Sequence, residues 1–247
     1  MPSDAAALAS AAGEWIRETV RSASMTGVVV GLSGGLDSAV SAALAARALG
    51  AGAVLGMALP CGSIPEDLRD AELVAEHLGI PFRVIDLTPA LDALADTAGL
   101  RGAPGVTLAN VKSRLRMTVL YAHSAGRLVL GTSNWSEILV GYWTKWGDGA
   151  ADLLPLARLY KSEVRAVAES LGLPARIVER IPSAGLWPGQ SDEGEMGVTY
   201  DEIETFFRGG DPGSRASARI AEMVRASEHK RRPVPFFDAR EWMGRHA

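Results

Sequence analysis

Two spacings of apolar residues alternate along this chain and predict its secondary structure. Short apolar runs at 26–30, 53–59, 82–87 and 127–130, the first of them rich in β-branched residues, are typical of strands buried in a parallel sheet. Other segments carry apolar residues every three or four positions, which is the spacing of a helix with one buried face. They predict helices over 4–22, 39–49, 66–78, 89–98, 107–125, 135–139, 159–171, 199–207 and 213–229.

The first helical segment also predicts which of its faces is buried. That face consists of Leu8, Ala12, Trp15, Ile16 and Thr19. Ser3 or Asp4 can accept hydrogen bonds from the unpaired N–H groups at the start of the helix. We therefore expect this helix to begin near residue 4 and to bury the side that carries Trp15.

Strands that alternate with helices predict an α/β fold, with a doubly wound, mostly parallel sheet and helices on both faces. No internal repeat, low-complexity segment or linker interrupts the sequence, so residues 1–247 are expected to form a single domain. In sheets of this kind, ligands bind where the carboxyl ends of the strands meet. The residues that directly follow the strands are therefore the first candidates for a functional site.

Composition narrows the classes of partner. The formal charge of −4 and the pI near 5.6 argue against a nucleic-acid partner, which usually requires a basic face. The 47% apolar content is enough for a sizeable core, and no apolar run reaches the length of a membrane span. The one cysteine, Cys61, excludes a disulfide within the chain and suits a reducing compartment. With no signal-peptide pattern at the N-terminus, the prediction is a cytoplasmic protein.

A glycine-rich segment, Gly31 to Ser38, follows the first predicted strand and precedes a helix. The N–H groups of such a turn and the positive end of the helix dipole converge on one point, which makes an anion site. Gly34 and Gly35 permit close approach of a ligand, while Ser33 and Ser38 add hydroxyl groups. This segment, the phosphate loop, is predicted to bind phosphate.

The sequence of the phosphate loop excludes two common types of phosphate-binding loop. No lysine follows the glycines, as a Walker A loop requires, and the glycine spacing differs from that of a dinucleotide fingerprint. The pattern S-G-G-x-D-S resembles the loop of ATP pyrophosphatases, enzymes that adenylate a substrate. Asp37 fits this interpretation, because an acid beside a triphosphate implies Mg²⁺ between them. The alternative is an ordinary turn in which Asp37 caps the helix.

A second strand–turn–helix boundary lies at Gly131 to Glu137. Thr132 can hydrogen-bond a nucleotide, and Glu137 can face Asp37 across the end of the sheet and hold the same Mg²⁺. Taken alone, the segment is better explained as a capping box in which Ser133 pairs with Ser136 or Glu137.

A third segment, Gly141 to Asp152, combines aromatic residues, a lysine and acids in an irregular glycine-rich loop. Tyr142, Trp143 and Trp146 can flank a flat ring, and Lys145 can hold an anion. The alternative is that the aromatic side chains pack in the core and the charges are exposed.

These segments, in this order, resemble the ammonia-dependent NAD synthetases, which are ATP pyrophosphatases of the adenine nucleotide alpha hydrolase-like superfamily. The resemblance covers nearly the whole chain. It includes the phosphate loop, 110–117 (N-V-K-S-R-L-R-M), 131–137, 141–152, Lys161, 181–197 and the His229–Lys230 tail.

The resemblance implies a role for each matching residue. ATP would be bound by Gly31, Leu32, Ser33, Gly34, Gly35, Leu36, Asp37, Ser38, Thr132, Lys161 and Ser183, and deamido-NAD by Arg114, Lys145, Asp152, His229 and Lys230. Mg²⁺ would be held by Asp37 and Glu137. Ser183 stands where threonine is frequent in the family, and the hydroxyl is retained. Without the family, Lys161 would be placed on a solvated helix face and His229–Lys230 in a charged tail.

The implied reaction has two steps. The nicotinate carboxylate of deamido-NAD attacks the α-phosphorus of ATP, which releases pyrophosphate and leaves an adenylate. Ammonia then attacks the activated carbonyl and displaces AMP, giving NAD. Lys161 would stabilise charge on the phosphates, and no protein nucleophile is required. Residues 181–197, rich in glycine and proline, predict a mobile loop that closes over the adenylate.

The sequence also bears on whether the nitrogen comes from glutamine or from ammonia. Glutamine hydrolysis needs a nucleophilic side chain with a partner base, and Cys61 lies in a loop without a histidine motif. Free ammonia, or a separate amidotransferase subunit, is therefore expected. The family also implies a homodimer. His77, His123 and His246 have no motif around them and are expected to be structural or exposed.

Two alternatives remain open. Trp135, Trp143 and Trp146 are larger than the residues expected from the family, which leaves room for an amide synthetase of the same fold that adenylates a different carboxylate. A non-catalytic nucleotide-binding module is the alternative of another class. Asp37, Glu137 and Lys161 argue against the second alternative, because nucleotide binding alone does not require two metal carboxylates.

Overall fold

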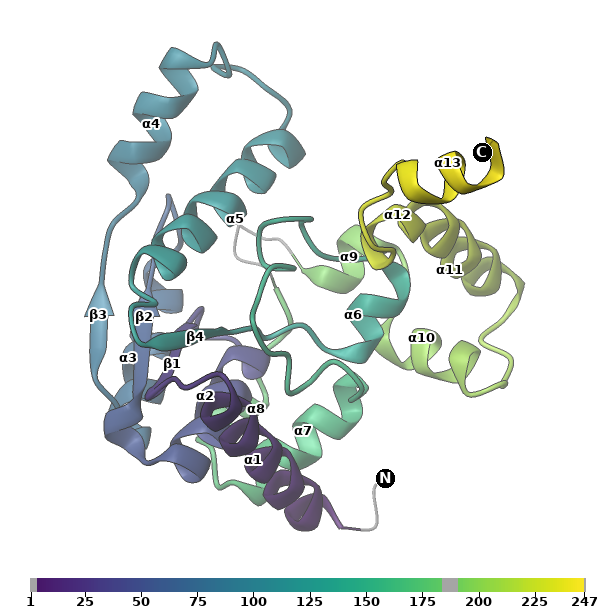
Figure 1. Cartoon of the computed structure of the whole chain (residues 1–247). Coiled ribbons are helices and arrows are strands. Elements are labelled where there is room, and N and C mark those ends of the chain that lie inside the picture. The colour runs from purple at the N-terminus through teal and green to yellow at the C-terminus, as the bar shows by residue number, and fades with distance from the viewer. Residues whose placement is uncertain (1–3, 184–190, 247) are drawn as a thin grey trace.

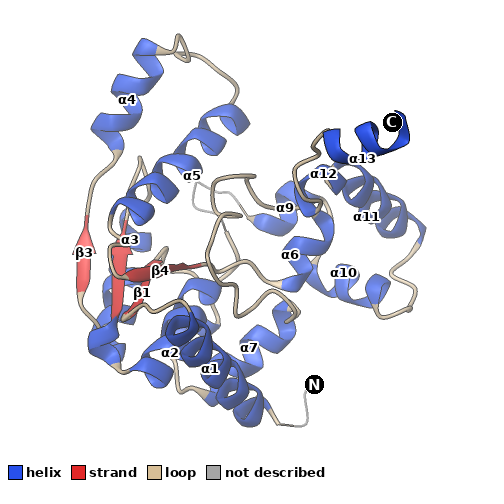
Figure 2. Cartoon of the chain, viewed as in Figure 1, coloured by secondary structure: helices blue, strands red, loops and turns tan. Residues whose placement is uncertain are grey.

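A four-stranded sheet lies at the centre of the computed structural model, which describes residues 4–183 and 191–246. Its strands are β1 (Gly27–Gly31), β2 (Val54–Ala58), β3 (Phe82–Val84) and β4 (Arg127–Leu130), in the order β3-β2-β1-β4 (Figure 2). Every pairing is parallel, and Val29 of β1 is paired with both Leu55 and Val129. The predicted strands are confirmed, although β3 ends at Val84 and not at residue 87.

Helices connect the strands and extend beyond the sheet (Figure 1). Their bounds are α1 Ala5–Ser22, α2 Leu36–Leu49, α3 Pro65–Leu78, α4 Thr88–Thr97, α5 Gly105–Ala122, α6 Trp135–Val140, α7 Lys161–Ser170, α8 Ala175–Val178, α9 Asp192–Met196, α10 Tyr200–Phe207, α11 Ser214–Ala226, α12 Glu228–Arg231 and α13 Ala239–His246, with a 3₁₀ turn η1 at Ala51–Ala53. The predicted helices are found with ends shifted by a few residues. The one predicted at 213–229 is divided at Ser227 into α11 and α12.

Successive side chains of a strand point to opposite faces of the sheet. Both faces of this sheet carry apolar side chains, and helices cover both. Val28 and Val30 belong to the core shared with α1, α2 and α7, whereas Val29 packs in a separate core with Met117 and Leu120 of α5. The predicted doubly wound α/β fold is confirmed.

The buried face of α1 differs from the predicted one. Asp4 caps the helix as expected, accepting a hydrogen bond from the Ala7 N–H group at 2.8 Å. Trp15, however, is 46% exposed, and the buried residues are Ala9, Gly13, Ile16 and Val20. Ile16 is buried as predicted, and Leu8 and Ala12 pack against the core. Trp15 was placed wrongly, because the buried face runs through the small residues Ala9 and Gly13 instead. At Gly13 a Cβ atom would lie 3.5 Å from the Cβ of Ala48, so α1 approaches α2 closely.

A third core cluster lies beside the sheet and joins α6, α9, α10 and α11 (Figure 1). It is made of Val140, Met196, Val198, Tyr200, Ile203, Ala216 and Ile220. The prediction of a loop over residues 181–197 is wrong at 192–196, which form α9 with Ser191 as the N-cap. Residues 184–190 of that predicted loop lie outside the described residues. In the described part of the chain, no helix has the length and hydropathy to cross a membrane.

Candidate active site

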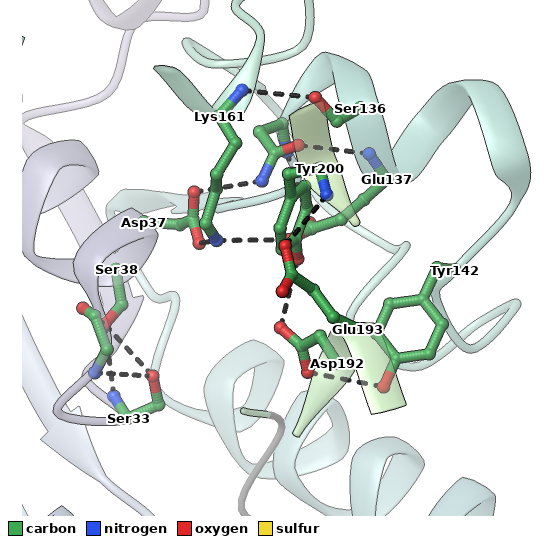
Figure 3. Close-up of polar contacts among 12 residues, drawn as sticks. Ser33, Asp37, Ser38, Ser136, Glu137, Tyr142, Lys161, Asp192, Glu193 and Tyr200 are labelled. Carbon is green, nitrogen blue, oxygen red and sulfur yellow. Dashed lines mark hydrogen bonds and ion pairs between the residues drawn. The ribbon is translucent and has the colours of Figure 1, made fainter. Parts of the chain in front are cut away.

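The phosphate loop connects β1 to α2 at the carboxyl end of the sheet, where it was predicted (Figure 3). The Ser38 hydroxyl donates to the Gly35 carbonyl at 3.0 Å and lies 3.2 Å from the Ser33 hydroxyl. Gly34 has φ +77°, and a Cβ atom there would lie 2.5 Å from the Asp67 carbonyl oxygen, so only glycine fits. No side chain of the described residues caps the N-terminus of α2, which leaves its first N–H groups for an anion.

Behind the loop, one lysine lies between two carboxylates from distant segments. Lys161 Nζ is 2.5 Å from Asp37 Oδ2 and 3.5 Å from Glu137 Oε1 (Figure 3). Asn134 donates to the other oxygen of Asp37 at 3.0 Å. The Lys161 backbone N–H donates to the Ser136 hydroxyl at 3.1 Å, which joins the starts of α6 and α7. The sequence placed Lys161 on a solvated face when the family was left aside; it is instead 5% exposed.

The electrostatics of this cluster follow from its burial. Burial and the nearby negative charge of Asp37 raise the pKa of Glu137 to about 8. Burial by itself lowers the pKa of Lys161, but the attraction of Asp37 and Glu137 is larger, so the net shift is upward. Lys161 therefore stays charged. Full ionisation of both acids requires more positive charge than Lys161 supplies.

Glu137 also has a structural role, of the kind predicted by the alternative interpretation of its segment. Its backbone N–H donates to Asn134 Oδ1 at 3.0 Å, and its Oε2 accepts from the Asn134 N–H at 3.4 Å. This is a capping box at the start of α6, with Asn134 in the place predicted for Ser133. The other oxygen, Oε1, faces Lys161. Glu137 thus serves both the helix and the cluster.

The cluster continues through two tyrosines and two acids. Of these, the sequence identified only Tyr142, as a candidate to flank a flat ring; Tyr200, Asp192 and Glu195 were missed. The Tyr200 hydroxyl lies 3.1 Å from Glu137 Oε1 and 3.0 Å from Asp192 Oδ2. The Tyr142 hydroxyl lies 3.3 Å from Asp192 Oδ1 and 2.8 Å from Glu195 Oε2. Burial raises the pKa of Asp192, Tyr142 and Tyr200. Residues 192–195 carried a signal, an excess of acids in a segment taken for a loop.

An arginine that sequence reasoning also missed holds the phosphate loop from outside. Arg180 donates to the Gly34 carbonyl at 3.2 Å and to Asp70 Oδ2 at 2.6 Å, and it forms an ion pair with Asp67. Arg176 forms a second ion pair with Asp70. Burial raises the pKa of Asp67 although Arg180 opposes the shift. Arg180 therefore links α3 and α8 to the loop.

A cavity of about 420 Å³ connects these groups. At one end, the phosphate end, it is lined by the phosphate loop, Thr132, Glu137, Lys161 and Ser183. Its other side is lined by residues of α5, of the loop after α6 and of α12: Asn110, Ser113, Arg116, Tyr142, Trp143, Thr144, Asp148 and Lys230. Of the three aromatic residues predicted to flank a flat ring, Tyr142 and Trp143 line this cavity, whereas Trp146 is 60% exposed.

The five residues predicted to bind deamido-NAD, here called the acceptor group, are arranged differently. Of these five, only Lys230 is among the residues that line the cavity. Arg114 donates to the Lys145 carbonyl at 3.2 Å, and Lys145 Nζ donates to the His229 carbonyl at 2.9 Å. Lys230 Nζ donates to the carbonyls of Gly141 and Trp143, at 2.7 and 2.5 Å. Asp152 accepts from the Val129 N–H at 2.7 Å.

The residues at the phosphate end fit a magnesium ion. Asp37 and Glu137 offer hard oxygen ligands within one cluster, and the raised pKa of Glu137 shows that further positive charge is favoured there. Among the described residues, no group of three or more histidine, cysteine or acidic side chains is placed to hold a metal. An ion bound here would therefore need phosphate oxygens to complete its ligands, as Mg²⁺ does in nucleotide sites.

Comparisons with known proteins place this chain in one family. The model of the NAD synthase family matches residues 8–234. The NH(3)-dependent NAD(+) synthetase of Carboxydothermus hydrogenoformans is 45% identical over 88% of this chain and 91% of its own length. The Pyrococcus horikoshii protein of the same description is 46% identical over 89% and 91%.

Solved structures give the same picture. An NMN synthetase from Francisella tularensis has a TM-score of 0.90 and 38% identity, covering 95% of this chain and 98% of that chain. An NH3-dependent NAD synthetase from Campylobacter jejuni has a TM-score of 0.79 and 32% identity, covering 95% and 99%. The similarity extends over nearly the full length of each protein.

Proposed function

This chain belongs to the NAD synthase family, and we propose that it is a ligase that amidates deamido-NAD to NAD with ATP as co-substrate and ammonia as nitrogen donor. One observation carries the proposal. Asp37, Glu137 and Lys161, which lie far apart in the sequence, meet beside a phosphate loop on the wall of one cavity. That arrangement suits a reaction at a phosphate, and it exceeds what nucleotide binding alone requires.

The chain's own groups bind and orient the triphosphate. The phosphate loop and the start of α2 offer N–H donors, and the hydroxyls of Thr132 and Ser183 line the same end of the cavity. We assign Asp37 and Glu137 to a Mg²⁺ ion, which would neutralise phosphate charge and make the α-phosphorus more electrophilic. Lys161 is held within the cluster, so its charge is in place before substrates arrive.

The reaction then needs positioning more than side-chain chemistry. The substrate carboxylate attacks the α-phosphorus, the bond to the pyrophosphate oxygen breaks, and pyrophosphate departs with its charge balanced by Lys161. Ammonia attacks the carbonyl carbon of the adenylate, AMP leaves with the electron pair of the broken bond, and the nitrogen loses a proton. We assign no covalent intermediate to the protein, because Cys61, a buried thiol whose pKa is raised by burial, is unsuited to nucleophilic attack.

The acceptor group supports a proposal about assembly. Arg114, Asp152 and His229 are exposed, and their neighbours on α5 include Val106 and Tyr121, which are 58% and 41% exposed. We propose that a second copy of this chain covers this side of α5 and completes the deamido-NAD site, as a homodimer. Sedimentation at micromolar concentration tests this: a monomer that still binds deamido-NAD contradicts it. The cytoplasmic location stays a prediction from the sequence.

A second candidate function has an observation in its favour. The NMN synthetase from Francisella tularensis gives the higher TM-score of the two structures described above. Amidation of the smaller nicotinate mononucleotide uses the same carboxylate and the same adenylation. The two functions therefore differ only in whether the adenylate half of deamido-NAD is bound.

A product assay distinguishes these functions. Purified protein is incubated with ATP, Mg²⁺ and ammonium, together with deamido-NAD or with nicotinate mononucleotide, and AMP, pyrophosphate and the amide product are counted. Equal yields of all three with deamido-NAD support the first proposal, and equal yields only with the mononucleotide support the second. AMP and pyrophosphate with neither substrate, but with another carboxylic acid, would contradict both. Replacement of ammonium by glutamine should give no product.

A further inference from the structure

Packing and hydrogen bonds hold the Tyr200 side chain in one position. It is 5% exposed and packs in the third core cluster, at the first position of α10. Its ring centre lies 4.8 Å from Lys161 Nζ, and its backbone N–H donates to Glu193 Oε1 at 2.9 Å (Figure 3). The hydroxyl is therefore held at one place, between Glu137 and Asp192.

Glu137 depends on that hydroxyl for its orientation. Its Oε1 has two partners, the Tyr200 hydroxyl at 3.1 Å and Lys161 Nζ at 3.5 Å, and the hydroxyl is the nearer. Its Oε2 is in the capping box, where the contact is long, at 3.4 Å. Lys161 itself lies 1.0 Å closer to Asp37 than to Glu137, from distances of 2.5 and 3.5 Å. Without the hydroxyl, the carboxylate that faces Asp37 would be weakly held.

From this placement we infer that Tyr200 is a positioning residue, which orients Glu137 toward Asp37 and thereby sets the affinity of the site for a divalent cation. The inference rests on the proposed function for the identity of the ion. Residues that hydrogen-bond a metal ligand from behind commonly control metal affinity in this way. Tyr200 touches neither phosphate nor the reacting carbon in this role, so it acts through Glu137.

Asp192 competes for the same hydroxyl. A tyrosine hydroxyl donates one proton, and here it faces a carboxylate oxygen on each side. Asp192 is anchored by its backbone N–H, which donates to the Pro182 carbonyl at 3.1 Å. An asparagine at 192 can donate an amide N–H to the tyrosine oxygen, which leaves the hydroxyl proton to Glu137. The two partners of Tyr200 are thus separable by substitution.

The test measures metal binding and not turnover. Mn²⁺, the probe, is titrated into the full-length protein with an α,β-methylene analogue of ATP, and free Mn²⁺ is followed by electron paramagnetic resonance. Tyr200→Phe keeps the ring and removes the hydroxyl, and it should weaken Mn²⁺ binding by about tenfold. Tyr160→Phe is the matched control: its ring packs on Arg208, at 4.4 Å, and Mn²⁺ binding should not change.

Asp192→Asn gives the sharper comparison. If Tyr200 acts on Glu137, this variant binds Mn²⁺ as tightly as the wild type or tighter. The inference is overturned if Tyr200→Phe binds Mn²⁺ like the wild type, or if Tyr200→Phe and Asp192→Asn weaken binding equally, since the latter marks a general loosening of α9 and α10. A wild type that binds Mn²⁺ but makes no amide would contradict the proposed function and leave this inference standing.

Discussion

At the phosphate end of the cavity, charged side chains form ion pairs with one another; in the acceptor group, no charged side chain forms an ion pair with another described residue. Lys161 is paired with Asp37 and Glu137, and Arg180 with Asp67 and Asp70. Lys145 and Lys230, in contrast, donate only to carbonyl oxygens among their described hydrogen bonds.

This difference indicates which end of the cavity already has its binding conformation before ligands bind. Side-chain pairs that are buried and mutually bonded have little freedom, so the phosphate end is preorganised for charge that develops in the reaction. A lysine on a carbonyl oxygen is bound to a neutral partner, and an anionic ligand can replace that partner at low cost. We therefore expect changes at the phosphate end to lower kcat or to raise the KM for ATP, and changes in the acceptor group to raise the KM for deamido-NAD.

The largest effect should come from Asp37→Asn. The amide removes the carboxylate that we assign to Mg²⁺ and the closest ion-pair partner of Lys161, so kcat should fall by at least about 10²- to 10³-fold while the fold is kept. Steady-state kinetics and a thermal melt measure the two outcomes. Asp201→Asn, on an exposed acid of α10, is the control. Ordinary turnover by Asp37→Asn would remove the metal assignment.

Arg180→Lys should have the next largest effect, on ATP binding. Lysine keeps the charge but lacks the planar fork that reaches Gly34, Asp67 and Asp70 together, so the KM for ATP should rise about tenfold. Arg176→Lys is a matched control, because Arg176 pairs with Asp70 and has no contact with Gly34 among its described bonds. Equal KM values for the two variants would show that the loop does not depend on Arg180.

Lys145→Met tests the other side of the comparison. The variant loses one cation of the acceptor group and a bond to a main-chain carbonyl, so the KM for deamido-NAD should rise by roughly threefold to tenfold, with kcat and the KM for ATP unchanged. Lys145→Arg should restore most of the binding. A fall in kcat without a change in KM would contradict the distinction between the two ends.

The smallest effect concerns stability and pH. The folded protein holds the pKa of Glu137 at about 8, above its ordinary value of 4.5, so it binds a proton more tightly than the unfolded chain does. This contribution to stability is complete below pH 4.5 and is lost as the pH rises through about 8. The Tm of the metal-free protein should therefore fall over that range, by a few degrees. Glu137→Gln should reduce the slope, and Mg²⁺ with an ATP analogue should reverse the fall. A Tm independent of pH in the wild type would contradict the shift.

The sheet and the phosphate loop could be predicted because their signals are local. A β-branched run, a glycine-rich turn and a helix start stand together within 26–49, and each is visible in the letters. Short-range rules also found the Asp4 cap of α1. They failed for Trp15, because Ala9 and Gly13 form the buried face and apolar size was the wrong guide.

Most contacts between the site residues could not be predicted, because they join segments that lie far apart in the sequence. Lys161 and Asp37 are separated by 124 positions, and Arg180 and Gly34 by 146. Tyr200 looked like an ordinary start of an amphipathic helix, and α9 was hidden in a glycine-rich stretch. The family resemblance supplied Lys161 and Glu137. It did not show that the Asn134 side chain donates to Asp37 and accepts from the Glu137 backbone N–H.

The capping box at Asn134 has a consequence for motion. Glu137 uses Oε2 to hold the N–H of Asn134, the N-cap of α6, so a carboxylate that turns toward a cation must loosen that bond. The amide proton of Asn134 should then exchange with deuterium faster when a cation is bound, while the amides further along α6 stay protected. The exchange rate of the Asn134 amide would thus report whether a cation is bound in the cavity.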